Sequence, residues 1–260
     1  MKVIIPTGDK TIQFVTIFQH LKTKITDANI TFDEEKLYMQ GMDNSQIGLF
    51  ELQLPAGWFH TYDVSQAVTL GVNCELFYKM LHCLDRTQDI TLIFETEGDY
   101  LDIKFTSEEK GIIDKHFKLP LLDINVGLMH IPPIEYTADL QLDSVVFEKI
   151  IEQLLVFANS VKICCSESEV SLKTTHSSSL ECCQMDANIN FDDMKEYAIE
   201  EDAILHLTFS LEHLNWMVQF SKLSPEMFIH FKKDIPMKLT FNIGENCFIQ
   251  FFLAPKFEDY

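Results

Sequence analysis

The chain has 260 residues, of which 47% are hydrophobic, enough for one large or two small domains with buried cores. Its 40 Asp and Glu residues outnumber its 20 Lys and Arg residues, which gives a formal charge of −20. Phosphates would repel such a chain, so nucleic-acid binding over the whole surface is excluded and only a segregated basic face remains possible. Every basic residue except Arg86 is a lysine, which lacks the planar fork that reads guanine edges, so sequence-specific DNA recognition is not expected.

The sequence also bears on the compartment. No apolar run reaches the roughly 18 residues that a membrane span needs. The N-terminal segment is interrupted early by Pro6, so no signal peptide is expected. The seven cysteines are odd in number and contain no Cys-x-x-Cys pair, which favours free thiols in a reducing, intracellular compartment.

The first half of the chain alternates between helical and strand-like patterns. Apolar residues over 14–25 recur at the spacing of one helix face, and alternation over 36–40 predicts a strand. Asn73 predicts the start of a second helix, because its side-chain oxygen can accept a bond from a free N–H group of the first turn. Runs rich in β-branched and aromatic residues at 90–94 and 100–105 predict further strands.

The second half repeats this order after an extended connector. Prolines in the connector, residues 119–135, fix the backbone and remove donors that a central strand needs. Asp143 and Ser144 precede a helical stripe over 150–158, and Ser210 precedes a second one. Strands are predicted at 169–173, 203–209 and 248–253.

The repeated order indicates a structural duplication. Many strands with two helices in each half predict an α+β fold, with helices on one face of antiparallel sheets. We therefore divide the chain into an N-terminal domain (1–118), an interdomain connector (119–135) and a C-terminal domain (136–260).

The sequence carries none of the glycine-rich, zinc-binding or nucleophile motifs that mark common enzyme classes, so we do not expect an enzyme. The adjacent pairs Cys164-Cys165 and Cys182-Cys183 lie in predicted strands, where neighbours point to opposite faces and cannot chelate one zinc ion. Neither a metal nor a cofactor is predicted.

Two groups of residues are candidates for interactions. Lysines lie on or beside the predicted helices, although an ordinary solvated helix face would look the same. Met42, Ile47 and Leu49 surround a turn-like segment, and an apolar run leads to Pro255, although plain sheet core would explain both. From the residues alone both interpretations stay open.

Four segments resemble the proliferating cell nuclear antigen family, the sliding clamps of eukaryotes and some viruses. They are Met39-Gln-Gly-Met-Asp-Asn-Ser-Gln-Ile-Gly-Leu49, Leu70-Gly-Val-Asn73, Asp234-Ile-Pro236 and Leu253-Ala-Pro-Lys256. The resemblance covers the whole chain and implies two equivalent clamp domains, with three subunits closed around double-stranded DNA. It implies a processivity factor in DNA replication and repair, acting in the nucleus, or at a viral replication site if the source is a virus. The implied partners are DNA polymerase, other proteins with a clamp-binding motif and a clamp loader, with no membrane partner.

The resemblance also assigns residues, position by position. The DNA-facing candidates are Lys10, Lys22, Lys24, Lys79, Lys149 and Lys222. The candidates for a pocket that accepts client peptides are Met42, Gln46, Ile47, Leu49, Leu128, Ile131, Pro236, Phe252, Ala254 and Pro255. The subunit-interface candidates, on edge strands over 111–118 and 179–184, are Ile113, Lys115, Phe117, Leu180, Glu181 and Cys182. At Gln46 and Phe252 this chain departs from the histidine and tyrosine common in the family.

Other assemblies and another class were weighed beside the homotrimeric clamp. One alternative is a subunit of a heteromeric clamp or a monomeric polymerase accessory factor. The other is an acidic hydrolase on an unrelated fold, which the missing motifs disfavour.

Overall fold

The computed structural model describes residues 1–96, 98–175 and 184–256. The chain divides into two compact units, which are described separately. Unit 1 comprises Met1–Asn44, Glu51–Met129 and Gly244–Phe248. Unit 2 comprises Ser45–Phe50, His130–Ile243 and Ile249–Tyr260. None of the described helices is both long and apolar enough to cross a membrane.

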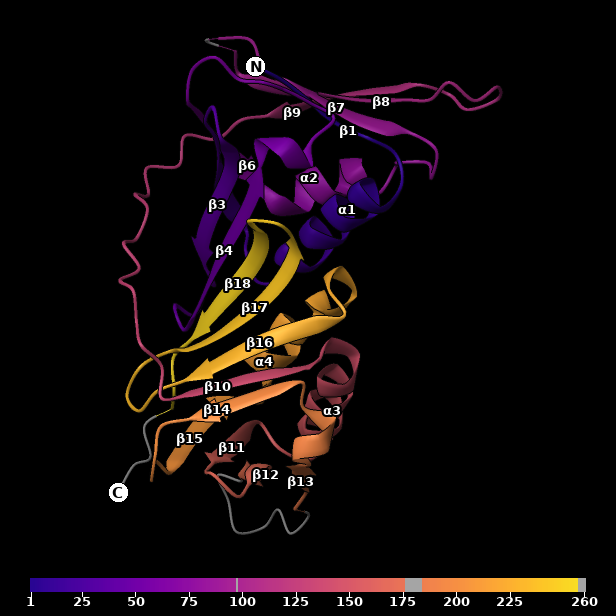
Figure 1. The fold of residues 1–260 in the computed structure, drawn as a ribbon. Coiled ribbons are helices and arrows are strands. Elements are labelled where there is room, and N and C mark those ends of the chain that lie inside the picture. Colours follow the sequence, from indigo (N-terminus) through magenta and orange to yellow (C-terminus); the bar gives the residue numbers. More distant parts are fainter. Residues whose placement is uncertain (97, 176–183, 257–260) are drawn as a thin grey trace. The chain divides into compact units, whose positions relative to one another are not determined.

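Unit 1 is built from two helices and antiparallel strands (Figure 1). Its helices are α1 (Asp9–Leu21) and α2 (Cys74–Leu81), with a short 3₁₀ helix η1 (Ala56–Trp58). Its strands are β1 (Lys2–Ile5), β2 (Asp27–Phe32), β3 (Lys36–Met42), β4 (Gly48–Pro55), β5 (Thr61–Asp63), β6 (Val68–Asn73), β7 (Asp89–Ile93), β8 (Tyr100–Thr106) and β9 (Lys115–Pro120). Residues 48–50 of β4 are assigned to unit 2. Hydrogen-bonded neighbouring strands follow the two orders β5-β1-β7-β8-β9 and β4-β3-β2-β6.

Unit 2 contains the same sequence of elements. Its helices are α3 (Ser144–Phe157) and α4 (Leu211–Val218), with 3₁₀ helices η2 (Phe191–Asp193) and η3 (Gln219–Leu223). Its strands are β10 (Ala138–Asp143), β11 (Ser160–Cys165), β12 (Val170–Thr175), β13 (Asp186–Ile189), β14 (Glu196–Ile199), β15 (Leu205–Ser210), β16 (Glu226–Phe231), β17 (Met237–Gly244) and β18 (Cys247–Leu253). They form neighbours in the orders β14-β10-β16-β17-β18 and β13-β12-β11-β15.

The two units therefore share one topology. The order β5-β1-β7-β8-β9 corresponds strand by strand to β14-β10-β16-β17-β18, and β4-β3-β2-β6 corresponds to β13-β12-β11-β15. In each unit one helix follows the first strand and the other follows the sixth. The duplication and the α+β class predicted from the sequence are confirmed.

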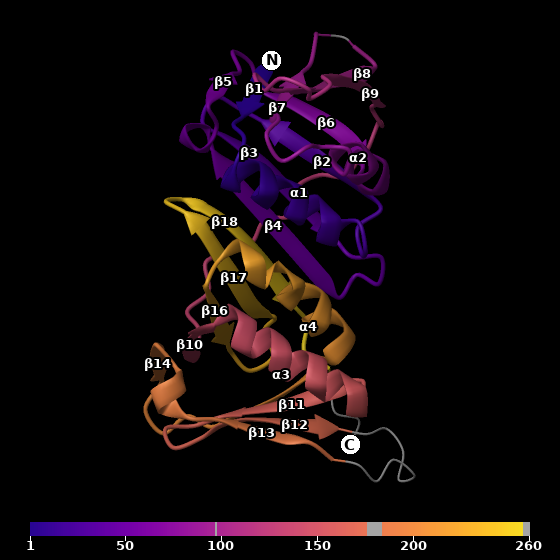
Figure 2. The ribbon, with the colours of Figure 1, turned by 90° about the vertical axis from the view of Figure 1, so that its right-hand side faces the viewer.

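Apolar packing between paired helices and sheets forms each core. In unit 1 the ring of Phe18 on α1 lies 4.5 Å from that of Phe77 on α2, and both side chains are fully buried. In unit 2, α3 and α4 lie side by side (Figure 2), and the ring of Phe220 in η3 lies 4.9 Å from that of Phe251 on β18. Burying aromatic rings of this size supplies most of the hydrophobic stabilisation that fixes the helices on the sheets.

The helix starts match the predicted capping residues. The Asn73 Oδ1 atom accepts a bond of 2.9 Å from the Leu76 N–H, and the Asp143 Oδ1 atom accepts one of 2.9 Å from the Val146 N–H. Ser210 occupies the equivalent position before α4, but its hydroxyl forms no capping bond. Capping oxygens of this kind satisfy donors that the first helical turn leaves open.

Two boundaries differ from the prediction. Ile25 is buried, but α1 ends at Leu21, so the stripe continues past the helix. The edge strand predicted from residue 111 begins only at Lys115, because the backbone turns at Gly111, whose φ is +93°. Ile113 therefore precedes β9, and the Ile113 carbonyl accepts a bond of 2.9 Å from the Gln88 side chain.

Candidate functional site

The candidate DNA-facing lysines differ in how exposed they are. Lys79, on α2, is exposed and forms an ion pair of 2.8 Å with Glu75. The hydrogen bond from the Lys79 ammonium holds the pKa of the Glu75 carboxyl below its ordinary value, so this carboxyl stays ionised at neutral pH. Lys149, on α3, and Lys222, in η3, are also exposed.

The lysines near α1 are engaged within unit 1. Lys10 lies inside α1 and not before it, and its Nζ atom donates a bond of 2.5 Å to the Trp58 carbonyl. The Lys22 Nζ atom lies 4.9 Å from the centroid of the Tyr78 ring, a cation–π distance. Lys24 is partly exposed. Lys79, Lys149 and Lys222 therefore offer the most accessible positive charge among the six candidates.

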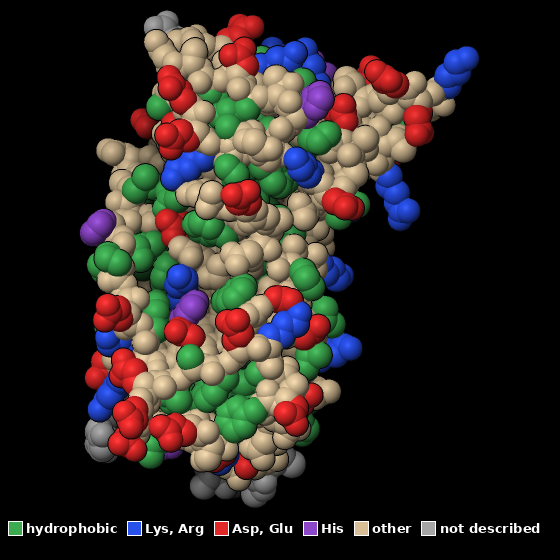
Figure 3. Space-filling model, in the orientation of Figure 1, with side chains coloured by type: hydrophobic (Ala, Val, Ile, Leu, Met, Phe, Trp, Pro, Cys, Tyr) green, Lys and Arg blue, Asp and Glu red, His purple; other side chains and the backbone are tan. Residues whose placement is uncertain are grey.

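Acidic side chains are exposed beside basic ones on the surface (Figure 3). They are spread over the displayed face, interspersed with lysines, and do not gather in one patch (Figure 3). On α3, Glu148 accepts a bond of 2.5 Å from the Ser221 hydroxyl, which ties the helix to η3. Any attraction to phosphate is therefore local to particular lysines and weak overall.

The client-pocket candidates fall in both units. In unit 2 the Ala254 N–H donates a bond of 3.1 Å to the Ile47 carbonyl, so these two parts of the candidate set lie together. Ile47 is 39% exposed, while Leu49 and Phe252 are nearly buried. Gln46 adopts a positive φ of 59°, which turns the chain sharply before β4.

The remaining candidates have accessible side chains. Ala254, Pro255 and Ile131 are half-buried, and Pro236 is exposed, all in unit 2. In unit 1, Met42 is 41% exposed and Leu128 is 60% exposed. Accessible apolar side chains of this kind can serve as contacts for an apolar anchor.

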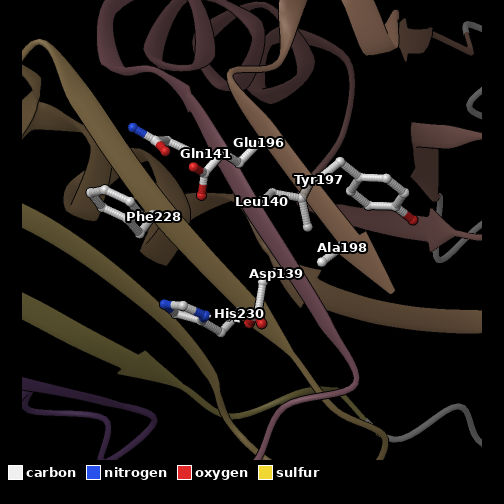
Figure 4. Close-up of a pocket in the computed structure, with 8 residues that line it drawn as sticks. All are labelled: Asp139, Leu140, Gln141, Glu196, Tyr197, Ala198, Phe228 and His230. Atoms are coloured by element: carbon white, nitrogen blue, oxygen red, sulfur yellow. Dashed lines mark hydrogen bonds and ion pairs between the residues drawn. The ribbon is translucent and has the colours of Figure 1, made fainter. Parts of the chain in front are cut away.

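A further hollow of unit 2, which contains none of these candidates, lies on β14, β10 and β16 (Figure 4). It has a volume of about 490 Å³ and contains a hydrogen bond of 2.5 Å between the Nδ1 atom of His230 and the Oδ1 atom of Asp139. None of its lining residues belongs to the candidate sets. Its side chains come from three separate strands, so no local pattern in the sequence predicts it.

The candidate subunit-interface residues are only partly described. β9 ends the order β5-β1-β7-β8-β9, so within the described ranges it is an edge strand. β13 likewise ends the order β13-β12-β11-β15. The Lys115 Nζ atom binds Asp85 at 2.5 Å, and Phe117 packs against Phe105 with ring centroids 5.5 Å apart. The other three candidates, Leu180, Glu181 and Cys182, lie outside the described residues, as does Cys183.

Three buried cysteines have thiols of low reactivity. Burial raises the pKa values of Cys74, Cys165 and Cys247 to about 12, so these thiols stay protonated at neutral pH. Cys164 and Cys165 lie on β11, as predicted. In the part of the chain that the structure describes, no three His, Cys, Asp or Glu residues gather in a way that could hold a metal ion.

The sequence analysis missed three contacts that hold the connector in unit 1. The Leu122 N–H donates to the Gly71 carbonyl at 2.8 Å. The Asn29 amide donates to the Ile124 carbonyl at 3.1 Å, and the Gln40 side chain contacts the backbone of Met129. Asn29 and Gln40 were overlooked because polar residues in an alternating strand normally face water.

Comparison with known proteins identifies the family. The model of the proliferating cell nuclear antigen N-terminal domain matches residues 10–128, and the model of its C-terminal domain matches residues 130–256. A curated proliferating cell nuclear antigen from Chaetomium thermophilum is 28% identical over 240 residues, covering 92% of this chain and 92% of that protein. With the duplicated α+β topology, these matches show that the chain belongs to the proliferating cell nuclear antigen family and is a DNA sliding clamp, a processivity factor of DNA replication and repair.

Proposed function

We propose that three copies of this chain close into a ring around duplex DNA, in the nucleus, and hold DNA polymerase and other client proteins beside it. The observation that carries this proposal is the duplicated topology with two different edge strands, β9 and β13, within the described residues. Two different edges that pair head to tail generate a ring if the rotation closes. Pairing also covers backbone groups that an exposed edge leaves open.

The proposed mechanism is topological and involves no catalytic step. A closed ring cannot leave DNA sideways, so weak, sequence-independent attraction between lysines and phosphates is sufficient to keep the duplex centred. A polymerase bound to the ring stays near its primer end, because tethering raises its effective concentration. A clamp loader that opens the ring is part of this proposal.

The mass in solution tests the assembly directly. Light scattering should give three times the subunit mass of 30.1 kDa. A monomeric mass would favour an accessory factor, and a trimer that forms only with other chains would favour a heteromeric clamp. Loaded protein should then stay on closed circular DNA and be lost when the DNA is linearised, since only encirclement makes retention depend on ends.

A pair of proline variants tests the proposed β9 edge. Neighbouring residues of an antiparallel edge strand point their N–H groups alternately toward the partner strand and away from it. His116→Pro and Phe117→Pro remove neighbouring N–H groups of β9. The N–H group that points toward β8 supports the pairing of β8 with β9, so its loss should weaken that pairing. The N–H group that points away from β8 lies on the free edge, so its loss should remove only a donor to the next subunit. We expect the variant that loses the free-edge N–H group to keep its thermal stability and become monomeric. If both variants stay trimeric, β9 is not the interface.

Charge reversal tests the lysine face. Lys79→Glu should weaken retention on DNA, while Lys233→Glu makes the same charge change at an exposed site outside the helices. Exposed substitutions usually change stability by less than about 0.5 kcal/mol, so the two variants should fold alike. Equal retention of the two variants would contradict the assignment of Lys79.

We further propose that clients dock a short motif against the candidate pocket residues of unit 2. A peptide with an aliphatic anchor and one or two aromatic rings on one helical turn would gain about 1.5–3 kcal/mol for each buried anchor, before ordering costs. Basic flanks of such a peptide would be attracted by the charge of −20.

Ala254→Arg should block this pocket with little damage to the fold. The backbone bond from Ala254 to Ile47 does not depend on the side chain, and Ala254 is only half-buried. Ala198→Arg, on the exposed face of β14, adds the same side chain away from the pocket and serves as the control. Calorimetric titration should show loss of peptide binding in Ala254→Arg alone; unchanged affinity would show that the pocket lies elsewhere.

A further inference from the structure

The first half of the connector, residues 121–129, is fixed to unit 1 at its main chain. Leu122 forms an isolated antiparallel bridge with Gly71 on β6. The Asn29 amide, on β2, donates to the carbonyls of Ile124 and Val126 at 3.1 and 3.5 Å. Three successive points of the connector are thus held through backbone atoms.

The last contact has two bonds. The Gln40 side chain, on β3, donates from Nε2 to the Met129 carbonyl at 3.0 Å and accepts at Oε1 from the Met129 N–H at 2.7 Å. A primary amide can donate and accept at once, so it pairs with a peptide group as another strand would. Gln40 is only 9% exposed, so the two bonds are largely shielded from competing water.

These contacts come from one row across three neighbouring strands. Asn29 pairs with Gln40 in the register of β2 and β3, and with Gly71 in the register of β2 and β6. We call the residues Gly71, Asn29 and Gln40 the anchor row. The connector crosses the row in order, from β6 to β3.

Each position of the row suits the chain that passes over it. A Cβ atom at Gly71 would lie 2.2 Å from the Leu122 carbonyl oxygen, so only glycine lets the connector approach this closely. Asn29 and Gln40 then provide neutral donors at increasing distance from this crossing. The row is thereby matched to the connector, which ordinary solvated polar residues would not be.

The contacts leave the side chains of the connector accessible. Val126 is 71% exposed, Leu128 is 60% exposed and Met129 is 41% exposed. Apolar side chains on a fixed backbone have already lost much of the freedom that a partner would otherwise need to remove. Leu128, a candidate client contact, precedes the residue that Gln40 clamps.

We propose that the anchor row consists of positioning residues for client binding: it holds the connector backbone so that Leu128 and its neighbours meet an incoming apolar peptide in a fixed place. This inference rests on the proposed client function. It predicts that loosening the row slows peptide association more than it speeds dissociation, because the free protein then has a smaller fraction of competent connector.

The test uses near-isosteric variants in the full-length protein. Asn29→Leu and Gln40→Leu remove the amide bonds at similar side-chain size. The double variant Thr31→Val with Thr69→Val is the matched control, because the Thr31 and Thr69 hydroxyls lie 3.1 Å apart on β2 and β6, two residues from the row on the same face. Hydrogen exchange of the free protein and stopped-flow binding of a synthetic peptide with one aliphatic and two aromatic anchors are measured for all proteins.

We expect amide exchange at 123–129 to accelerate about 3- to 10-fold for each removed anchor, with exchange in β2 and β3 unchanged. Peptide association should slow by a similar factor, and the threonine control should match the wild type. General destabilisation would instead raise exchange across all strands, and that pattern would overturn a positioning role.

Two failures can be told apart. Unchanged exchange at 123–129 in both leucine variants, or loosened exchange with unchanged association, overturns the inference even though the wild type binds the peptide. A wild-type protein that binds no peptide overturns the proposed client function, and the inference with it.

Discussion

In units 1 and 2, the segment that follows the last strand makes the same first contact, but its later contacts differ. After β9, the Leu122 N–H binds the Gly71 carbonyl at 2.8 Å; after β18, the Lys256 N–H binds the Thr208 carbonyl at 2.7 Å. Gly71 on β6 and Thr208 on β15 are equivalent in the two topologies. The first contact of the departing chain is therefore common to both units.

Beyond this contact, the side chains at equivalent register positions of the two units differ in chemistry. In unit 1 the register continues to Asn29 and Gln40, whereas in unit 2 it continues to Lys162 and Lys173. An ammonium group only donates, so a lysine cannot pair with both groups of a peptide unit as Gln40 does. The Nζ atom of Lys173 instead lies 3.7 Å from the Oε1 atom of Glu169. One topology can thus carry a docking row or an ordinary charged face, depending on two side chains.

The largest expected effect comes from adding one methyl group at the shared contact. Gly71→Ala places a Cβ atom 2.2 Å from a backbone oxygen, so the connector or β6 has to move, at a cost of about 1–3 kcal/mol. Thr208→Ala removes atoms and should cost less, within about 1 kcal/mol. Urea unfolding of both variants checks this ranking, and equal losses would contradict it.

Exchanging the rows should release the connector. Asn29→Lys with Gln40→Lys gives unit 1 the side chains of unit 2 and removes the amide contacts, so opening of the connector should become easier by about 1–2 kcal/mol. Thermolysin should then cleave within 121–134 about 5- to 30-fold faster than in the wild type. Cleavage at the wild-type rate would show that the Gly71 crossing alone holds the segment.

Side-chain capping also differs between the units, because Asn73 caps the second helix of unit 1 and Asp143 caps the first helix of unit 2. Asn73→Ala and Asp143→Ala each remove an acceptor at 2.9 Å and should each cost about 1 kcal/mol. Asp143→Asn keeps an acceptor and should cost well under that. Thermal unfolding of the three variants measures this, and an Asp143→Ala variant as stable as the wild type would contradict a stabilising role of this cap.

The smallest effect is expected from the reverse exchange. Lys162→Asn with Lys173→Gln should leave the free energy of unfolding within about 0.5 kcal/mol, because partly exposed charges contribute little. Denaturant unfolding provides the measurement. A gain of more than about 1 kcal/mol would mean that amides in this row acquire a partner in unit 2 as well.

Local patterns in the sequence predicted most of the helices and strands. The caps at Asn73 and Asp143 and the strands β3 and β12 depend on neighbours within a few residues, and these predictions are confirmed. The start of β9 was wrong because it depends on the turn at Gly111 and on a distant glutamine.

The anchor row could not be predicted from such patterns. Asn29 and Gln40 meet residues that lie 95 and 89 positions away in the chain, and alternation in a strand gives no information on what crosses its face. The DNA-facing lysines, the client pocket and the interface residues rest on family resemblance, and the domain boundaries rest on the repeated element order and the prolines of the connector. All of them stay predictions.

The anchor row forms hydrogen bonds only with backbone atoms of the connector. It therefore places little constraint on which amino acids the connector contains. Substitutions at Val126 or Leu128 could alter the apolar surface while leaving every anchoring bond in place. The segment can therefore diverge rapidly between lineages without any loss of its path. Gly71, Asn29 and Gln40 are the positions at which this freedom ends, and we expect variation among natural homologues to follow that division.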